Sequence, residues 1–232
     1  MTVSVDILQQ LPLLKGLPKL TLDELSKQGE IRAFNKREVV FNKGSAPTHL
    51  MFLYDGRLQG IDFTVDGKEV GCFFAEPGDF FGELGVMDGK THPETVIALV
   101  KSTVVALPRQ TIRPLLTAMP AMAEALTLKL ADKLRQASTQ RRILGLANPL
   151  QKVCAQLWTM QVSTSSAQMT AKIPLMPTHQ ELAIMINASR ETVTRVFQLL
   201  QSKAVVQRDG NDLLLLNLQM LKEISEGTKE GL

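Results

Sequence analysis

The chain has 232 residues, of which 44% are hydrophobic and 21% are charged, so it can form one large globular domain or two of ordinary size. The formal net charge is only +3, and attraction to nucleic acid must therefore come from a local basic surface. No apolar run reaches the roughly 18 residues of a membrane span, and no basic region precedes the apolar N-terminal residues. We therefore expect a cytoplasmic protein with no membrane partner.

The two cysteines, Cys72 and Cys154, lie far apart in the chain, and neither has a CxxC partner. This pattern argues against a disulfide scaffold, a thiolate zinc site and a cysteine-held iron–sulfur cluster. We expect both thiols to be buried as small hydrophobic side chains in a reducing compartment. Neither a metal ion nor an iron–sulfur cluster is expected as a cofactor.

Residues 1–29 have a helical pattern, and the character of the sequence changes at Ile31. From there to Leu107, short runs of β-branched and aromatic residues alternate with glycine turns such as Asp55-Gly56 and Asp66-Gly67. Seven strands are predicted, over residues 31–35, 38–41, 49–56, 58–65, 69–76, 95–100 and 102–108. Their regular spacing indicates a compact antiparallel barrel or roll.

Helical periodicity begins near Arg109 and is strongest from Ala121 to Leu146. An apolar-to-mixed seam steps by three or four residues through Ala123, Leu126, Leu130, Leu134 (or Lys133), Ala137, Arg141 and Leu144. This seam either packs on its own barrel or forms a coiled-coil-like dimer interface. We favour the dimer interface, because so long a helix needs a partner helix to cover its row of apolar side chains. Asn148-Pro149 ends the helix and predicts a hinge over 146–149.

The stretch from Thr178 to Leu200 predicts two short helices joined by a tight turn. Thr178 with Glu181 has the spacing of a capping box, and Asn187-Ala188-Ser189 forms the turn and the next cap. A helix over 150–160 and an exposed loop over 163–170 precede this stretch. Two strands, over 205–207 and 213–216, follow it as a wing, and the polar tail after Leu221 is expected to fray.

The second of these helices leaves polar side chains facing outward near its N-terminal end. They are Arg190, Glu191, Thr194 and Arg195. This is the layout of a helix-turn-helix, whose second helix offers its first turns to base edges in the major groove. An ordinary helical hairpin is the alternative, but cap, turn and polar face occur here in the order that DNA recognition requires.

Three motifs carry a family resemblance over most of the chain, from about residue 10 to 217. The segments Pro77–Leu84, Gln180–Ala183 and Ser189–Arg195 resemble those of the CRP/FNR family of bacterial transcription regulators. The resemblance implies an α+β fold with an N-terminal antiparallel β-roll or jelly-roll sensor domain. It further implies a long dimerisation helix and a C-terminal winged helix-turn-helix. We expect these domains at 1–118, 119–147 and 148–232.

The resemblance also implies a DNA site and partners. Arg190, Glu191 and Arg195 are expected to read bases in a TGTGA-type half-site, repeated as a palindrome that a homodimer binds. Phosphate contacts are implied for the residues Thr178, His179, Gln180 and Ser189. RNA polymerase is a further expected partner, and no enzyme activity is expected. Carboxylate pairs such as Glu83 with Asp79 have no nucleophile, metal set or phosphate loop beside them.

The effector segment departs from the family pattern. Cyclic-AMP-binding relatives place an Arg-Ser pair after Gly-Glu-Leu, whereas this chain has no arginine in residues 90–95 and has Pro93 or Glu94 at the arginine's place. A carboxylate there repels a phosphate, so an effector other than cyclic AMP is favoured. The effector-binding residues that the resemblance implies are Gly82, Glu83, Leu84, Lys90, His92, Thr95 and Ser138.

The sequence leaves several effectors open. Lys90 and His92 can rebuild an anion site, and Arg135, Arg141 and Arg142 can serve a bulkier anion such as cyclic di-GMP. A haem would need an axial ligand, for which the candidates are His49, His92 and Cys72. A nucleotide-type effector is thus possible, its identity is unknown, and the chain can also be a ligand-independent member of the family.

Overall fold

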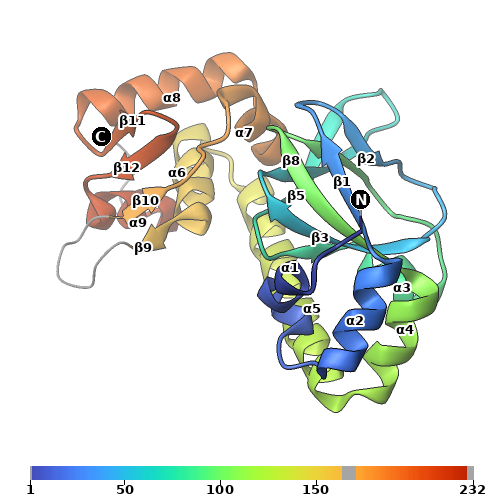
Figure 1. Ribbon diagram of the computed structural model, residues 1–232. Coiled ribbons are helices and arrows are strands. Elements are labelled where there is room, and N and C mark those ends of the chain that lie inside the picture. Colours follow the sequence, from blue (N-terminus) through green and yellow to red (C-terminus); the bar gives the residue numbers. More distant parts are fainter. Residues whose placement is uncertain (1, 164–170, 229–232) are drawn as a thin grey trace. The chain divides into compact units, whose positions relative to one another are not determined.

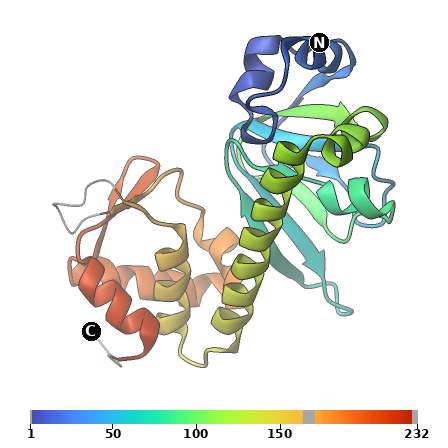
Figure 2. The same ribbon diagram turned by 90° about the horizontal axis from the view of Figure 1, so that it is seen from below.

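The structure is a computed structural model that describes residues 2–163 and 171–228. The chain divides into two compact units, Met1–Arg135 and Gln136–Leu232. Helix α5 (Pro120–Gly145) is continuous, with its N-terminal part in the first unit and its C-terminal part in the second (Figure 2). Most of the predicted loop over 163–170 lies outside the described residues.

The first unit is built on two four-stranded sheets with antiparallel pairing throughout (Figure 1). One sheet has the order β1-β8-β3-β6, and its strands are β1 (Glu30–Phe34), β8 (Ser102–Pro108), β3 (His49–Asp55) and β6 (Phe80–Phe81). The other has the order β2-β7-β4-β5, with β2 (Val39–Phe41), β7 (Thr95–Ala98), β4 (Leu58–Phe63) and β5 (Glu69–Ala75). All seven predicted strands form, and the α+β class is confirmed.

Two hydrophobic cores meet at the first sheet. Met51 and Leu53 of β3 face the interior of the roll, where they join Phe81 and Val96. Alternate residues of the same strand, Leu50 and Phe52, pack under the helices on the other face. Strand β3 is therefore buried on both sides, which is why its sequence is a continuous apolar run rather than an alternating one.

The helices of the first unit are α1 (Val5–Gln10), a 3-10 turn (Pro12–Leu14), α2 (Lys19–Gln28), α3 (Glu83–Asp88) and α4 (Arg109–Ala118). Helix α3 and the short strand β6 were not predicted, because each is too short to show a periodicity. Gly82, which precedes α3, has a φ of 79°, in the left-handed region that favours glycine. This turn ends β6 and starts α3 without a side-chain cap.

The second unit combines a four-stranded sheet of order β11-β12-β10-β9 with helices (Figure 1). Its helices are α6 (Pro149–Met160), α7 (His179–Ile186), α8 (Arg190–Ser202) and α9 (Leu218–Glu226). Its strands are β9 (Val162–Ser163), β10 (Ala171–Ile173), β11 (Val206–Asp209) and β12 (Asp212–Leu215). The predicted wing is the β11–β12 hairpin, and it extends a sheet that begins before the helix-turn-helix.

Two expectations from the sequence about the C-terminal tail and the cysteines were wrong. The tail does not fray at Leu221, because α9 buries Leu221 and Ile224 against α6, and Asn217 caps its first turn by accepting from the Met220 amide at 2.9 Å. Cys72 is exposed rather than buried, whereas Cys154 is fully buried. Cys72 lies opposite the register shift between Gly60 and Ile61, where a bulge turns its side chain outward.

Candidate functional site

The helix-turn-helix has the caps and the turn that the sequence predicts. The hydroxyl of Thr178 accepts from the Glu181 amide at 3.3 Å, and the Glu181 carboxylate accepts from the Thr178 amide at 2.8 Å. Asn187 adopts a left-handed conformation with φ 50°, and Ser189 caps α8 by accepting from the Thr192 amide at 3.1 Å. The N-terminus of each helix is thus fixed by a side chain that hydrogen-bonds the backbone.

The apolar faces of α7 and α8 meet through buried side chains, and the charged residues lie outside. Val193 and Leu200 of α8 are fully buried. Arg190, Glu191 and Arg195 are exposed on its first turns. The pKa of Glu191 is lowered by hydrogen bonds from its own backbone and from the Ser189 side chain, and then by the two guanidinium charges. Within the described part of the chain, neither arginine forms an ion pair, so their donors face solvent.

His179 is held between the two helices of the motif. Its ring stacks on Phe197 with centroids 4.6 Å apart, and its Nδ1 lies 2.9 Å from the Thr194 hydroxyl. Burial, followed by the charges of Arg208 and Arg190, lowers the pKa of His179. Thr194 was expected to face outward, but its half-buried hydroxyl is engaged by His179 and donates to the Arg190 carbonyl. The His179 ring therefore has only its Nε2 left to offer to a partner.

Two side chains from outside the motif hold the C-terminal end of α7. The Gln140 amide, in the last turns of α5, donates to the Met185 carbonyl at 2.6 Å. The Lys152 ammonium, in α6, donates to the Ile186 carbonyl at 3.4 Å and complements the helix dipole. These contacts fix the motif to two other helices of the same unit, and no sequence pattern links residues so distant in the chain.

The predicted effector residues fall into different environments. Gly82 forms the left-handed turn, and a Cβ there would lie 3.2 Å from the ring of His92. Glu83 is buried and forms an ion pair with Lys133 of α5 at 2.9 Å, whereas Leu84 is 49% exposed. Lys90 is exposed and pairs only loosely with Asp88, at 3.7 Å.

His92 and Thr95 are buried inside the roll. The His92 ring stacks on Phe41 with centroids 3.8 Å apart, and burial lowers the pKa of His92 despite the nearby charge of Glu83. The Thr95 hydroxyl accepts from the Lys43 amide at 3.0 Å. Ser138 is exposed and belongs to the second unit, whereas the other predicted effector residues belong to the first.

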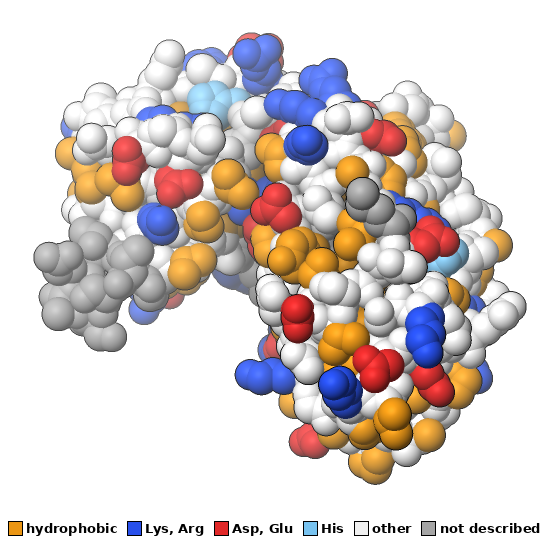
Figure 3. Space-filling model, in the orientation of Figure 1, with side chains coloured by type: hydrophobic (Ala, Val, Ile, Leu, Met, Phe, Trp, Pro, Cys, Tyr) orange, Lys and Arg blue, Asp and Glu red, His pale blue; other side chains and the backbone are white. Residues whose placement is uncertain are grey.

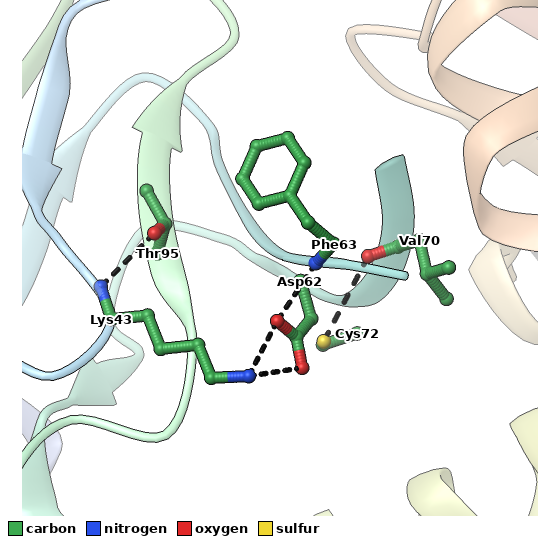
Figure 4. Close-up of polar contacts among 6 residues, drawn as sticks. All are labelled: Lys43, Asp62, Phe63, Val70, Cys72 and Thr95. Carbon is green, nitrogen blue, oxygen red and sulfur yellow. Dashed lines mark hydrogen bonds and ion pairs between the residues drawn. The ribbon is translucent and has the colours of Figure 1, made fainter. Parts of the chain in front are cut away.

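A charged cluster that the sequence did not indicate lies next to these residues (Figure 4). Lys43 pairs with both carboxylate oxygens of Asp62, at 2.7 and 2.8 Å, while Cys72 lies close by on β5. The pKa of Cys72 is raised to about 11, first by partial desolvation of the thiol, although the residue as a whole is exposed, and then by the charges of Glu94 and Asp62. The pKa of Glu94 is itself raised, by burial and then by Glu83. Carboxylates therefore outnumber ammonium groups around the predicted effector segment.

The two units match two separate family models, which together cover more than half of the chain. Residues 31–118 match a cyclic nucleotide-binding domain, and residues 151–224 match a Crp-like helix-turn-helix domain. The fold and the site thus define a protein class in which a β-roll of the cyclic nucleotide-binding type precedes a winged helix-turn-helix.

Relatives and solved structures agree with this class. The chain is 24% identical over 216 residues to the cyclic AMP receptor protein of Thermus thermophilus, covering 93% of this chain and 97% of the relative. It is 23% identical over 217 residues to a CRP-like cAMP-activated global transcriptional regulator of Mycobacterium tuberculosis, covering 93% and 97%. The structure of FixK2 from Bradyrhizobium japonicum has the same fold, with a TM-score of 0.74, 20% identity and coverage of 84% and 96%.

The chain belongs to the CRP/FNR family, and it is a DNA-binding transcription regulator rather than an enzyme.

Among residues 2–163 and 171–228, no helix is long and apolar enough to cross a membrane. Within the same ranges, no group of three or more His, Cys, Asp or Glu side chains is placed to hold a metal ion. Acidic and basic side chains are interspersed on the roll surface that Figure 3 shows.

Proposed function

We propose that two copies of this chain bind a palindromic duplex and that each copy presents α8 to one TGTGA-type half-site. The observation that carries this proposal is the exposure of Arg190, Glu191 and Arg195 on the first turns of a helix with a capped N-terminus. The first turns of a recognition helix are those that reach base edges in the major groove.

The chemistry of the three side chains matches distinct base edges. A guanidinium fork such as that of Arg190 donates to O6 and N7 of guanine, and Glu191 accepts from the amino group of cytosine. Arg195 lies one turn after Glu191, on the same face of α8, and reads a neighbouring base. The two arginines carry no competing ion pair within the described chain, so binding does not first have to break one.

The position of the protein along the duplex is set by phosphate contacts from side chains near the N-terminal ends of α7 and α8. Thr178 and Ser189 cap these helices, and the exposed Thr178 hydroxyl retains the capacity to donate to a phosphate. The Ser189 hydroxyl would first have to leave Glu191 or Thr192. Gln180 is exposed on the first turn of α7, and its side-chain amide can donate to a phosphate. The Nε2 of His179 would donate to a phosphate only from the imidazolium form, because Nδ1 already donates to the Thr194 hydroxyl. Such contacts position the protein without specifying sequence.

The proposed dimer uses helix α5. Leu128 and Leu134 are 59% and 70% exposed on this helix, where a second copy would cover them. The proposed domains are the roll at 1–118, the dimerisation helix at 119–147 and the DNA-binding domain at 148–232. A dimer of this kind acts in the cytoplasm, with RNA polymerase as a further partner.

The proposed effector is not cyclic AMP. Pro93 and Glu94 stand at the place of the phosphate-binding arginine, and Glu94 is half-buried beside Glu83, so a cyclic phosphate would face carboxyl groups. A cyclic-AMP response is the second candidate, favoured by the names of the two relatives. A response to cyclic di-GMP and a ligand-independent mode are the third and fourth candidates.

Duplex binding tests the proposal. We expect the full chain to bind a TGTGA palindrome more tightly than a scrambled duplex of equal length, salt held constant. Replacing Arg190 by alanine should remove that preference, with a loss of about 1–3 kcal/mol. Lys27→Ala, which removes an exposed positive charge from α2, is the matched control. Equal binding of the two duplexes by the wild type would refute the direct readout.

Calorimetry tests the effector. We expect no heat of binding when cyclic AMP is added to the full chain at micromolar concentration. Cyclic di-GMP, added in a separate titration, distinguishes the bulkier nucleotide from a ligand-independent regulator. Micromolar binding of cyclic AMP would overturn the inference from Pro93 and Glu94.

A further inference from the structure

One ammonium group of helix α5 is surrounded by acceptors from the roll. The Lys133 Nζ lies 2.9 Å from the Glu83 carboxylate and donates to the Phe80 carbonyl at 3.1 Å. The same atom lies 5.6 Å from the ring centroids of both Phe73 and Phe80. The Glu83 side chain is only 5% exposed, so its charge is compensated by Lys133 rather than by water. We call these groups of Glu83, Phe73 and Phe80 the ammonium cage.

Each part of the cage attracts a positive charge. A carboxylate and a carbonyl oxygen accept hydrogen bonds, and the faces of aromatic rings carry negative electrostatic potential. Glu94 adds a second carboxyl group near Glu83, as the effect of Glu83 on the pKa of Glu94 indicates. An anion would therefore be repelled where Lys133 lies, whereas a primary ammonium ion satisfies every group.

A second ion pair supports the same docking. Lys129 lies one helical turn before Lys133, so both side chains project from one face of α5. The Lys129 ammonium pairs with Asp79, which directly precedes Phe80 in the chain. Both pairs join α5 to the segment from Asp79 to Glu83, which contains the predicted effector residues Gly82 and Glu83. All of these residues belong to the first unit.

We propose that the predicted effector site is a binding site for a primary ammonium ion and that Lys133 is its resident occupant. Helix α5 is thereby docked on the roll without a small-molecule effector, and an external ligand of Glu83 must first displace Lys133. This inference deepens the proposed function, because it specifies what fills the site that was expected to take an effector.

Chemical rescue tests the cage directly. Lys133→Ala removes the chain segment that n-propylammonium replaces, so the chloride salt of this amine should raise the melting temperature of the variant in a concentration-dependent way. Sodium chloride at equal ionic strength and propan-1-ol at equal concentration control for salt and for the alkyl chain. The wild type should show no such specific rise, because its site is occupied. The double variant Lys133→Ala/Glu83→Gln should also show none, because the carboxylate is gone.

A response of Lys133→Ala to n-propylammonium no larger than that of the wild type would overturn the proposal. If this variant does not fold, Glu83→Gln in the full chain provides the test by hydrogen–deuterium exchange. We expect the amides of residues 129–135 to exchange several-fold faster in Glu83→Gln than in the control Asp132→Asn, which loses only an exposed pair with Arg135. Equal exchange rates in the two variants would refute docking by the cage.

Neither measurement uses DNA. A chain that shows the rescue but does not prefer the TGTGA palindrome would contradict the proposed readout and leave the cage in place. A chain that prefers the palindrome but shows neither the rescue nor the change in exchange would contradict the cage and leave the readout in place.

Discussion

The helix-turn-helix and the predicted effector site use charged side chains in opposite ways. On α8, Arg190 and Arg195 extend into solvent, and the caps of the motif engage backbone groups instead. In the roll, Glu83 and Thr95 are buried, and each already has a partner within the chain. The guanidinium donors of α8 are thus available to the solvent, whereas Glu83 and Thr95 are engaged within the roll. The contrast separates side chains that are ready for a partner from side chains that already have one.

The largest effect is expected at the proposed dimer seam. Leu134→Asp places a charge on an exposed apolar position of α5, so we expect dissociation into monomers. Palindrome affinity should then fall by about 100-fold or more, because the second half-site contact is no longer tethered to the first. Analytical ultracentrifugation gives the mass, and fluorescence anisotropy gives the affinity.

Leu20→Asp is the matched control, because Leu20 is 80% exposed on α2. Leu134 is a better probe than Leu130, which packs partly against the core of the first unit, so its substitution would also weaken the fold. A dimeric mass for Leu134→Asp with unchanged affinity would contradict the seam.

A smaller effect is expected at the caps of the DNA-binding motif. Thr178→Ala and Ser189→Ala each remove a hydroxyl that accepts from a helix N-terminal amide, and should each lower the free energy of unfolding by about 1 kcal/mol. Urea denaturation of the full chain measures this change. Thr127→Ala, in the interior of α5, removes a hydroxyl that caps nothing and should leave stability nearly unchanged. Equal losses in all three variants would contradict the assigned caps.

The buried histidine of the roll predicts a dependence of stability on pH. Burial lowers the pKa of His92 below its usual value, so near and below pH 6.5 the unfolded chain binds more protons than the folded chain. The contribution of neutral His92 to the free energy of unfolding is therefore fully present above about pH 6.5, and it is lost as pH falls through the lowered pKa of the folded state. His92→Phe keeps a ring against Phe41 and removes the titration.

Urea unfolding between pH 7 and pH 5 should then show a shallower loss of stability in His92→Phe than in the wild type. Some dependence should persist, because the pKa values of His49 and His179 are also lowered by burial. An identical slope in the variant and the wild type would contradict the buried, neutral state of His92.

The smallest expected effect concerns the exposed thiol beside the charged cluster. Because the pKa of Cys72 is raised to about 11, alkylation by iodoacetamide in a Cys154→Ser background should be slow at pH 7. The rate should increase about tenfold per pH unit up to pH 9 without levelling. Asp62→Asn removes one of the charges that raise this pKa and should accelerate the reaction, whereas Glu69→Gln should not. A rate that levels near pH 8.5 would contradict the raised pKa.

The contrast between the two regions also explains how much could be predicted from the sequence. Local signals specify the helix-turn-helix: the spacing of Thr178 and Glu181 and the turn at Asn187 depend only on near neighbours. The strands of the roll were predictable for the same reason. The ion pair of Lys133 with Glu83 joins residues that are 50 positions apart in the chain, and their register depends on how α5 packs on the roll. No periodicity encodes such a contact, just as none indicates the hydrogen bond from Gln140 to Met185.

Composition alone misled in two places. A polar tail was expected to fray, yet the apolar side chains of Leu221 and Ile224 recur at helical spacing and pack on α6. Cys72 was expected inside because free cysteines are commonly buried, but the irregular pairing of β4 with β5 places it at the surface. Both errors arise because packing decides the outcome where the local signal is weak.

The most direct test of DNA readout by α8 is a base-substitution cycle on the palindrome. Affinities of the wild type and of Arg190→Ala are measured by fluorescence anisotropy on the TGTGA palindrome and on duplexes with single guanines replaced, at one salt concentration. We predict that one guanine substitution costs the wild type about 1–3 kcal/mol and costs Arg190→Ala almost nothing, so that the two changes are coupled. Independent, additive losses at every guanine would contradict the claim that Arg190 reads the half-site.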